Sequence, residues 1–218
     1  MRTALARRES PGRQVGYASV RQRTRLPRDL ASIFVAAAVV LVARASLADH
    51  YVVPTGSMEP TVEIGDHIFV DKLAYGLRVP FTRTYLVRGE APARGDVVVL
   101  ESPTEGDVLL KRVVAVAGDV VEVEGGRVTI DGRAAPVTER DGGVLEELGN
   151  RTHALGTDYG GGPSFGPTLV PEGKVLVLGD NRGNSKDGRY FGWVDRDAVL
   201  GRAVSVCVRD RHLVWRGL

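Results

Sequence analysis

Cysteine, histidine and lysine are scarce in this chain of 218 residues. The single cysteine, Cys207, excludes an intramolecular disulfide framework and a structural zinc site made of cysteines. Only four lysines stand beside 25 arginines, so a lysine inside an apolar stretch is conspicuous. The formal net charge of +2 gives no reason to expect nucleic acid as a partner, and no pattern predicts a cofactor or a bound metal ion. The length suits one catalytic domain.

Positive charge is concentrated at the N-terminus. Residues 1–28 contain eight arginines and one acidic residue, and we expect them to form a basic cytoplasmic arm. An uncharged run, residues 30–43, follows, and a helix over residues 30–47 would measure about 27 Å, close to the thickness of a bilayer. Because the arginines precede this run, the positive-inside rule keeps the arm in the cytoplasm. We therefore predict a single transmembrane anchor over residues 29–48, with the remaining domain outside the cytoplasmic membrane.

Two other interpretations of the apolar run remain open. Ala43, Arg44 and Ala45 fit the small-x-small rule of a cleaved secretory signal, and a buried core helix is the third alternative. The long leader before the run favours a retained anchor over a cleaved signal. With either an anchor or a signal, the main domain lies outside the cytoplasm.

From residue 50 onward, short β-branched runs alternate with Gly, Pro and Asp, and no helical period is sustained. We therefore predict a mostly β fold class: an antiparallel, partly closed β-sheet domain over residues 49–218, behind the N-terminal transmembrane helix. Residues 124–127 predict a hairpin turn, and residues 134–170 are expected to form an irregular excursion off the sheet. The predicted strand-forming runs are 67–70, 96–100, 108–117, 119–132, 174–180 and 203–210.

Three short stretches carry candidate chemistry. In the first, Pro54, Gly56 and Pro60 surround Ser57, which suits an exposed hydroxyl on a tight loop. In the second, strand alternation places Lys111 on one face with apolar neighbours. Such a face disfavours the charged form of the amine and lowers its pKa, so a neutral lysine is available to take a proton from a serine hydroxyl.

The third stretch, residues 179–194, is polar, rich in turn residues and closely followed by aromatics, which is typical of a loop that packs under a site. A calcium loop is rejected because Arg182 occupies the third loop position, where an oxygen ligand belongs. Taken one at a time, the three stretches also fit a turn serine, a surface lysine and an ordinary loop.

Together, the segments PTGSMEPT (54–61), KRVVAVAGD (111–119) and GDNRGNSKDGRYFGWV (179–194) resemble the type I signal peptidases, which are membrane-anchored leader peptidases with a Ser–Lys dyad. The similarity covers the anchor and most of residues 50–205. It implies that Ser57 is the nucleophile and Lys111 the general base. It also implies that the Thr55 side chain donates to the oxyanion beside the backbone N–H of Ser57.

The resemblance assigns supporting roles to the third segment. It makes Ser185 a hydrogen-bond partner that orients the lysine, and Asp187 with Arg189 a structural ion pair that holds the loop. Two positions depart from the commoner pattern of the family, since Gly183 replaces an Asp and Gly188 replaces a Ser. From these two changes we expect altered loop packing and retained activity.

The function implied by the resemblance is that of a membrane-anchored serine endopeptidase, a hydrolase that removes N-terminal signal peptides from exported preproteins. Its partners are then preproteins with small residues at the P1 and P3 positions, together with the lipid bilayer. Residues 49–218 form the extracytoplasmic peptidase domain in this interpretation.

Other classes of function were weighed against this one. A Ser-His-Asp hydrolase needs a histidine near the serine, but the four histidines carry no recognisable signature and no G-x-S-x-G elbow is present. A non-catalytic member would bind preproteins in the same groove, yet Ser57 and Lys111 are both retained, which favours activity. A self-cleaving SOS-response repressor is disfavoured by the anchor and by the lack of a DNA-binding helical domain. The histidines are His50, His67, His153 and His212.

Overall fold

The computed structural model describes residues 30, 32–37, 40, 48–79, 82 and 84–218, and it divides into the units Met1–Ala37 and Ala38–Leu218. The described residues 30, 32–37 and 40 are helical. In the described part of the chain, no helix has both the length and the apolar character needed to cross a membrane. The predicted arm lies outside the described residues and the predicted anchor lies largely outside them, so both stay predictions.

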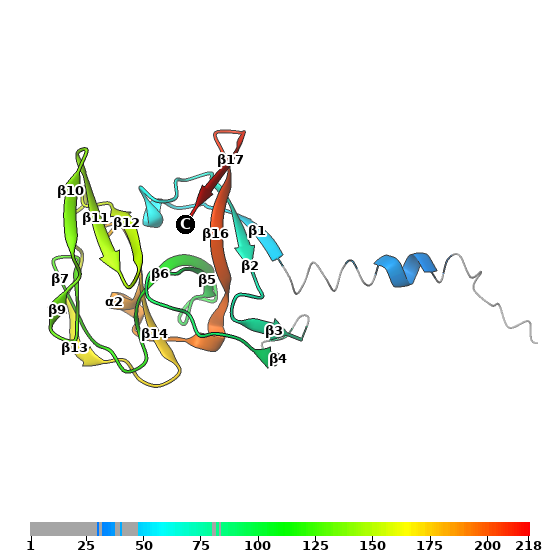
Figure 1. Ribbon diagram of the computed structural model, residues 1–218, viewed down its shortest axis with the longest axis horizontal. Coiled ribbons are helices and arrows are strands. Elements are labelled where there is room, and N and C mark those ends of the chain that lie inside the picture. Colours follow the sequence, from blue (N-terminus) through cyan, green and yellow to red (C-terminus); the bar gives the residue numbers. More distant parts are fainter. Residues whose placement is uncertain (1–29, 31, 38–39, 41–47, 80–81, 83) are drawn as a thin grey trace, which may run out of the picture. The chain divides into compact units, whose positions relative to one another are not determined.

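The second unit is mostly β, as predicted, and its main sheet has eight strands. Seven follow the order β1-β2-β16-β5-β6-β14-β15, β17 pairs with β16, and every pair is antiparallel. The strands are β1 (Ala48–Val52), β2 (His67–Asp71), β5 (Val97–Glu101), β6 (Val108–Val116), β14 (Lys174–Leu178), β15 (Val194–Asp195), β16 (Val199–Arg209) and β17 (His212–Gly217). Figure 1 shows β5 and β6 curving between β14 on one side and β16 with β2 on the other.

Three smaller sheets complete the described part of this unit. Short helical turns are η1 (Gly56–Met58), α2 (Gly188–Phe191) and η2 (Arg196–Ala198). The sheets are β13-β7-β8-β9, made of Phe165–Leu169, Val120–Glu124, Arg127–Ile130 and Arg133–Ala134; β10-β11-β12, made of Val137–Arg140, Gly143–Leu148 and Arg151–Leu155; and β3-β4, made of Gly76–Arg78 and Tyr85–Arg88. The predicted hairpin joins β7 to β8, where Gly125 and Gly126 both have positive φ, as a two-residue hairpin turn requires.

The expected irregular excursion over residues 134–170 is wrong in one respect. The segment does leave the main sheet, but β10, β11 and β12 form a regular antiparallel meander. Its first hairpin turns at Asp141 and Gly142, both at positive φ, which is the chemistry of a tight two-residue turn. The alternation was hard to recognise because Thr, Glu and Arg side chains cover much of the exposed face of these strands.

Strand β5 runs through the middle of the core and is buried on both faces. Val97 and Val99 pack in a cluster with Met58, whereas Val98 and Leu100 pack in a separate cluster with Val113. Because η1 follows Pro54 and inserts Met58 into the first cluster, apolar burial ties the short segment around Ser57 to this side of the sheet.

Candidate active site

Ser57 lies on a turn that is held from both sides. The backbone N–H of Val62 donates to the Met58 carbonyl (3.0 Å), and that of Glu59 donates to the Gly56 carbonyl (3.2 Å). A Cβ atom on Gly56 would lie 2.6 Å from a carboxylate oxygen of Glu59, so the glycine leaves room for the Glu59 side chain to fold over the turn. The result is a fixed serine with 9% of its surface exposed.

Lys111 reaches Ser57 from strand β6. Its cross-strand partner is Val98, which packs in the apolar cluster of Leu109 and Val113, as the strand alternation predicts. The ammonium nitrogen Nζ donates to Ser57 Oγ (2.7 Å) and to the Leu110 carbonyl (3.0 Å). The two candidate residues are therefore in direct contact, although 54 positions separate them in the sequence.

The surroundings of Lys111 make its amine a weaker base than that of an ordinary lysine. Its side chain is buried, and this burial lowers its pKa from 10.5 to about 8. The carboxylates of Asp187 and Asp180 act in the opposite direction but do not outweigh the burial. A substantial fraction of the lysine is therefore neutral near pH 8, and the neutral amine is able to accept a proton.

A groove of about 440 Å³ opens beside the pair. It is lined by residues 51–55, 57–58 and 107–111, with Ile68 and Val99 also contributing. Three strands, β2, β16 and β5, separate β1 from β6 in the sheet order, yet residues of both β1 and β6 line this groove. The sheet therefore curls until the edges of β1 and β6 approach each other. The lining is mostly apolar, which suits a peptide with small or apolar side chains.

Thr55 lies on the groove immediately before η1. It is the N-cap residue of this turn, but its hydroxyl makes no capping hydrogen bond, and the residue is exposed. The position therefore leaves the hydroxyl free to donate to a ligand in the groove, beside the backbone of Ser57.

Ser185 lies close to the pair, but the expected hydrogen bond to Lys111 is not formed. Within the described part of the chain, its buried Oγ has no hydrogen-bond partner. A Cβ atom added to Gly179 would lie 2.3 Å from Ser185 Oγ and 2.4 Å from the Ser57 carbonyl oxygen. The absence of a side chain at Gly179 thus brings the end of β14 against both serines.

Asp187 and Arg189 form the expected ion pair, and both side chains are fully buried. Asp187 Oδ2 accepts from Arg189 Nη2 (2.8 Å) and from the backbone N–H of Gly179 (3.0 Å), while Oδ1 caps α2 through the N–H of Arg189 (3.2 Å). The pair therefore fastens both ends of the loop that follows β14.

A second buried ion pair, Arg112 with Asp180, lies next to Lys111 and was not predicted from the sequence. Arg112, next to Lys111 in β6, donates two hydrogen bonds to Asp180 (2.8 and 2.7 Å), and Thr61 donates a third (2.6 Å). Burial alone would raise the pKa of Asp180, but Arg112, together with His153 and the Thr61 hydroxyl, lowers it overall. Arg112 and Asp180 both belong to the motifs that carry the resemblance. The position of Arg112 next to Lys111 was the sequence signal that could have indicated this pair.

Asn181 connects the Arg112–Asp180 pair to the turn of Ser57. Its backbone N–H donates to the Ser57 carbonyl (3.1 Å), and its side-chain Nδ2 donates to the Gly56 carbonyl (3.1 Å). The loop after β14 therefore holds the turn through the consecutive carbonyl groups of Gly56 and Ser57. The Ser57 hydroxyl remains directed to Lys111.

The meander also reaches this loop, which the sequence did not indicate. Arg182 forms a fully buried ion pair with Glu146 of β11, including a hydrogen bond of 3.1 Å to Oε1. His153 of β12 lies between the two carboxylates, with Nε2 3.4 Å from Glu146 and 3.7 Å from Asp180. Burial would raise the pKa of Glu146, but His153 and Arg182 lower it overall. The meander is thus joined to the loop after β14 through buried charges.

The two glycines that depart from the family pattern sit at close backbone approaches. A Cβ atom on Gly183 would lie 2.0 Å from the Tyr159 carbonyl oxygen, and one on Gly188 would lie 2.9 Å from the Val177 carbonyl oxygen. The absence of both side chains therefore lets residues 159–160 and β14 pack against the loop. The expected change in loop packing has a physical basis at both positions.

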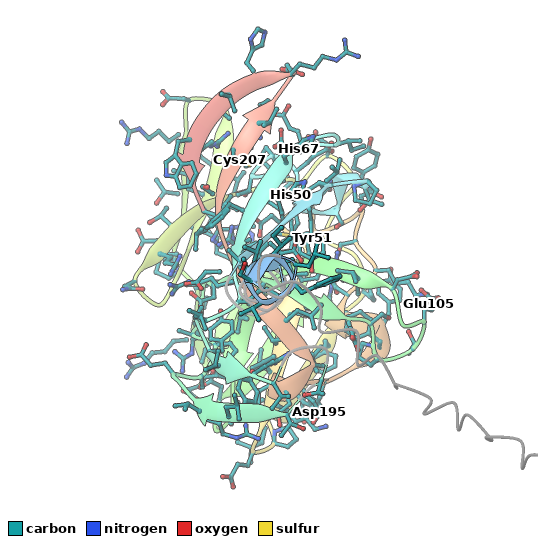
Figure 2. The ribbon with its side chains drawn as sticks, turned by 90° about the vertical axis from the view of Figure 1, so that its right-hand side faces the viewer. His50, Tyr51, His67, Glu105, Asp195 and Cys207 are labelled. Carbon is teal, nitrogen blue, oxygen red and sulfur yellow. The ribbon has the colours of Figure 1, made fainter. Side chains whose placement is uncertain are left out.

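Two of the histidines, His50 and His67, lie on the strands β1 and β2. Figure 2 shows His50, His67 and Cys207 on neighbouring strands, where the two rings stack 6.1 Å apart. Cys207 is half-buried, and its thiol donates to the His67 carbonyl (3.3 Å). Within the described residues, no histidine contacts Ser57 or Lys111 by a hydrogen bond, and no group of three His, Cys, Asp or Glu residues is arranged to hold a metal ion.

Comparisons with known proteins point to one family. Residues 27–208 match the model of a family described as "Signal peptidase, peptidase S26". The chain is 34% identical over 199 residues to a signal peptidase I of Pseudomonas aeruginosa, with 85% of this chain and 68% of that protein covered. It is 31% identical over 180 residues to thylakoidal processing peptidase 1 of Arabidopsis thaliana, covering 81% of this chain and 46% of that protein. A solved signal peptidase I from Enterococcus faecalis V583 is 28% identical, with a TM-score of 0.37 and coverage of 53% of this chain and 98% of that chain.

Proposed function

The chain belongs to the signal peptidase family, peptidase S26, and we propose that it cleaves signal peptides with Ser57 as nucleophile and Lys111 as general base. As a signal peptidase I it is a serine peptidase, a hydrolase that acts on preproteins. The observation that carries the proposal is the 2.7 Å contact between Lys111 Nζ and Ser57 Oγ at the floor of an apolar groove.

The first step is proton transfer coupled to attack. Neutral Lys111 takes the Oγ proton of Ser57, and Oγ forms a bond to the carbonyl carbon of the scissile peptide. The carbonyl π electrons move to oxygen and give a tetrahedral oxyanion. Lys111 is now an ammonium and continues to donate to the Leu110 carbonyl, which helps to hold it in place.

The oxyanion requires donors that are already in position. The hydroxyl of Thr55 and the backbone N–H of Ser57 are the two candidates, since Thr55 lies on the groove without a capping hydrogen bond. Ser185 has a buried hydroxyl without a partner among the described residues, so it is available to the amine when the ammonium forms. In this proposal Ser185 is a positioning residue for Lys111.

Collapse of the oxyanion completes the reaction in two stages. The C–N bond breaks, and the departing amine of the mature protein takes the proton from the Lys111 ammonium. Lys111, neutral again, takes a proton from water, whose oxygen attacks the ester formed with Ser57. The signal peptide then leaves with a new carboxylate, and Ser57 regains its proton.

The substrate is proposed to bind as an extended strand. Strand β6 pairs with β5 over residues 108–112, but its other neighbour, β14, begins to pair only at Arg112. Strand β1 pairs with β2 and ends the sheet order. Both unpaired edges flank the groove, so a peptide is able to add main-chain hydrogen bonds to them, and the apolar lining favours small residues at P1 and P3.

The enzyme is further proposed to sit in the cytoplasmic membrane as a single-pass protein, with residues 1–28 inside and the peptidase domain, residues 49–218, outside. The arginine-rich arm followed by the apolar run supports this orientation. The described helical residues Ile33, Phe34 and Val35 also expose apolar side chains. Protease added to cells stripped of their wall or outer membrane is then expected to remove residues 50–218 and spare the arm. A mature protein that begins at Ser46 or His50 would instead indicate a cleaved signal.

One experiment tests the catalytic proposal directly. The full-length protein, solubilised in detergent, is incubated with a preprotein, and its Ser57→Ala variant is treated in parallel. We expect the wild type to release the signal peptide and the variant to release none. Cleavage by both proteins, or by neither, would overturn the assignment.

A further inference from the structure

The groove carries an acidic residue at the end away from the reactive pair. Asp107 is the only acidic residue among those that line the groove, and it is exposed. Its backbone is fixed by the turn between β5 and β6, where the buried Ser102 donates its N–H to the Asp107 carbonyl (2.7 Å). Figure 2 labels Glu105 in this same turn. The carboxylate is therefore tethered to one place beside the groove.

Within the described residues, the charge of Asp107 is not balanced by a basic partner, in contrast to the charges of Glu105 and Asp49. Glu105 pairs with Lys186, and Asp49 at the start of β1 pairs with Lys72 (3.5 Å). For Asp107, no ion pair or side-chain hydrogen bond is formed within the described residues. A peptide in the groove therefore meets one negative charge that is still available for pairing.

The spacing along β6 says which part of a peptide meets this charge. Asp107 precedes Lys111 by four residues, which corresponds to about 13 Å along an extended strand. A peptide paired with the free edge of β6, with its scissile bond at Ser57, places its fourth or fifth residue from that bond near Asp107. Because the small P1 and P3 side chains occupy the same groove, this residue lies on the N-terminal side of the bond.

We propose that Asp107 is a specificity-determining residue that favours a cationic side chain, and disfavours an acidic one, at position P4 or P5 of the substrate. This inference rests on the proposed function, because it takes the groove to be the binding site of the signal peptide. The contact is at an exposed rim, where ion pairs are weak and salt screens them. The expected preference for Lys over Glu is about threefold to tenfold in kcat/KM at low ionic strength.

Peptide pairs test the proposal with the full-length protein in detergent. A parent substrate with small residues at P1 and P3 is made with Lys, Glu or Ser at P4, and separately at P5, and kcat/KM is measured for each. The ratio of the Lys to the Glu peptide is the readout, because any general damage to the enzyme cancels in it. Asp107→Asn is expected to bring the ratio close to one, and Asp107→Lys to invert it. The exposed Asp141, in the turn of the β10–β11 hairpin, provides the matched control Asp141→Asn.

The outcomes separate the two proposals. A wild-type ratio above one at P4 or P5 that is lost in Asp107→Asn, retained in Asp141→Asn and reduced by about 1 M salt supports the inference. A wild-type ratio of one at both positions, or a ratio that survives in Asp107→Asn and Asp107→Lys, overturns it while cleavage itself continues. Failure of the wild type to cut even the Ser peptide would count against the proposed function instead.

Discussion

The two sides of the Ser57–Lys111 pair are built in opposite ways. Behind the pair, the loop after β14 is buried and held by ion pairs, of which Arg112–Asp180, Arg182–Glu146 and Asp187–Arg189 are almost fully inaccessible to solvent. In front of it, the groove is mostly apolar and flanked by unpaired strand edges. In the proposed mechanism, the buried side fixes the positions of Ser57 and Lys111, and the open side selects the peptide that reaches them.

This contrast accounts for the lowered pKa of Lys111, the proposed base. A carboxylate network close to Lys111 would by itself keep the amine charged, yet Asp180 and Asp187 are each neutralised by an arginine. Burial therefore prevails, and the pKa of Lys111 falls to about 8. The ion-paired side thus contributes to reactivity as well as to structure.

The largest effect is expected from Lys111 itself. Lys111→Arg keeps the charge, but a guanidinium stays protonated at any usable pH, so we expect kcat to fall by at least about 10³-fold. Lys111→Ala is expected to be equally inactive and still folded. In the wild type, activity should rise with pH through about 8, where the amine loses its proton, and then level off.

Single-turnover cleavage at several pH values checks this prediction. Lys174, which pairs with the exposed Asp195, provides the control, and Lys174→Arg should keep wild-type activity. A Lys111→Arg enzyme that cuts at a near wild-type rate would contradict the dyad, and another base would have to be found.

The next effect compares a buried ion pair with an exposed one. Glu146→Gln leaves the Arg182 charge buried without its counter-charge, so the free energy of unfolding should fall by about 3–5 kcal/mol. Glu105→Gln breaks the exposed pair with Lys186 and should change it by less than about 0.5 kcal/mol. Urea denaturation of the two variants measures both values. Equal losses in the two would show that burial does not distinguish these pairs.

Removal of the Thr55 hydroxyl, the proposed oxyanion donor, is expected to have the next largest effect. Thr55→Val removes the hydroxyl with little change in volume, and we expect kcat to fall by about 10²–10³-fold with KM nearly unchanged, since the donor acts in the transition state. Thr129→Val, in β8 of a separate sheet, should leave both constants unaltered. Wild-type kcat in Thr55→Val would mean that a different group donates to the oxyanion.

Sequence reasoning was most successful where local chemistry decides the structure. The β-branched runs predicted β2, β5, β6, β14 and β16, and Gly125 with Gly126 predicted the β7–β8 turn. Strand alternation also placed Lys111 among apolar side chains. These features depend on a few neighbouring residues, so the sequence pattern suffices.

Contacts between distant segments were not predictable in this way. Glu146 and Arg182 are 36 positions apart and Arg112 and Asp180 are 68 apart, and no periodicity connects their partners. The meander was not predicted because polar residues on its exposed strands obscure the alternation of apolar and polar side chains. Its contact with Arg182 through Glu146 could not be predicted for the same reason. The relative placement of two separate sheets, the main sheet and the meander, decides these contacts, and a single sequence does not contain it.

The smallest expected effect is a stabilisation, and it concerns the free-energy cost of the lowered pKa of Lys111. Lys111 has a pKa of about 8 in the folded protein against 10.5 in the unfolded chain, so the unfolded state binds more protons between these values. The folded state is therefore penalised below pH 8, and the penalty disappears as the pH rises to 10.5. Lys111→Met removes the amine at similar size, so at pH 7 it should raise the free energy of unfolding by about 1–3 kcal/mol. The gain should shrink steadily between pH 8 and 10.5 in urea denaturation, whereas Lys174→Met, which removes a lysine paired with the exposed Asp195, should show no such trend. A Lys111→Met protein no more stable than the wild type at pH 7 would mean that the amine is well solvated, and the open side of the site would then be wetter than its apolar lining indicates.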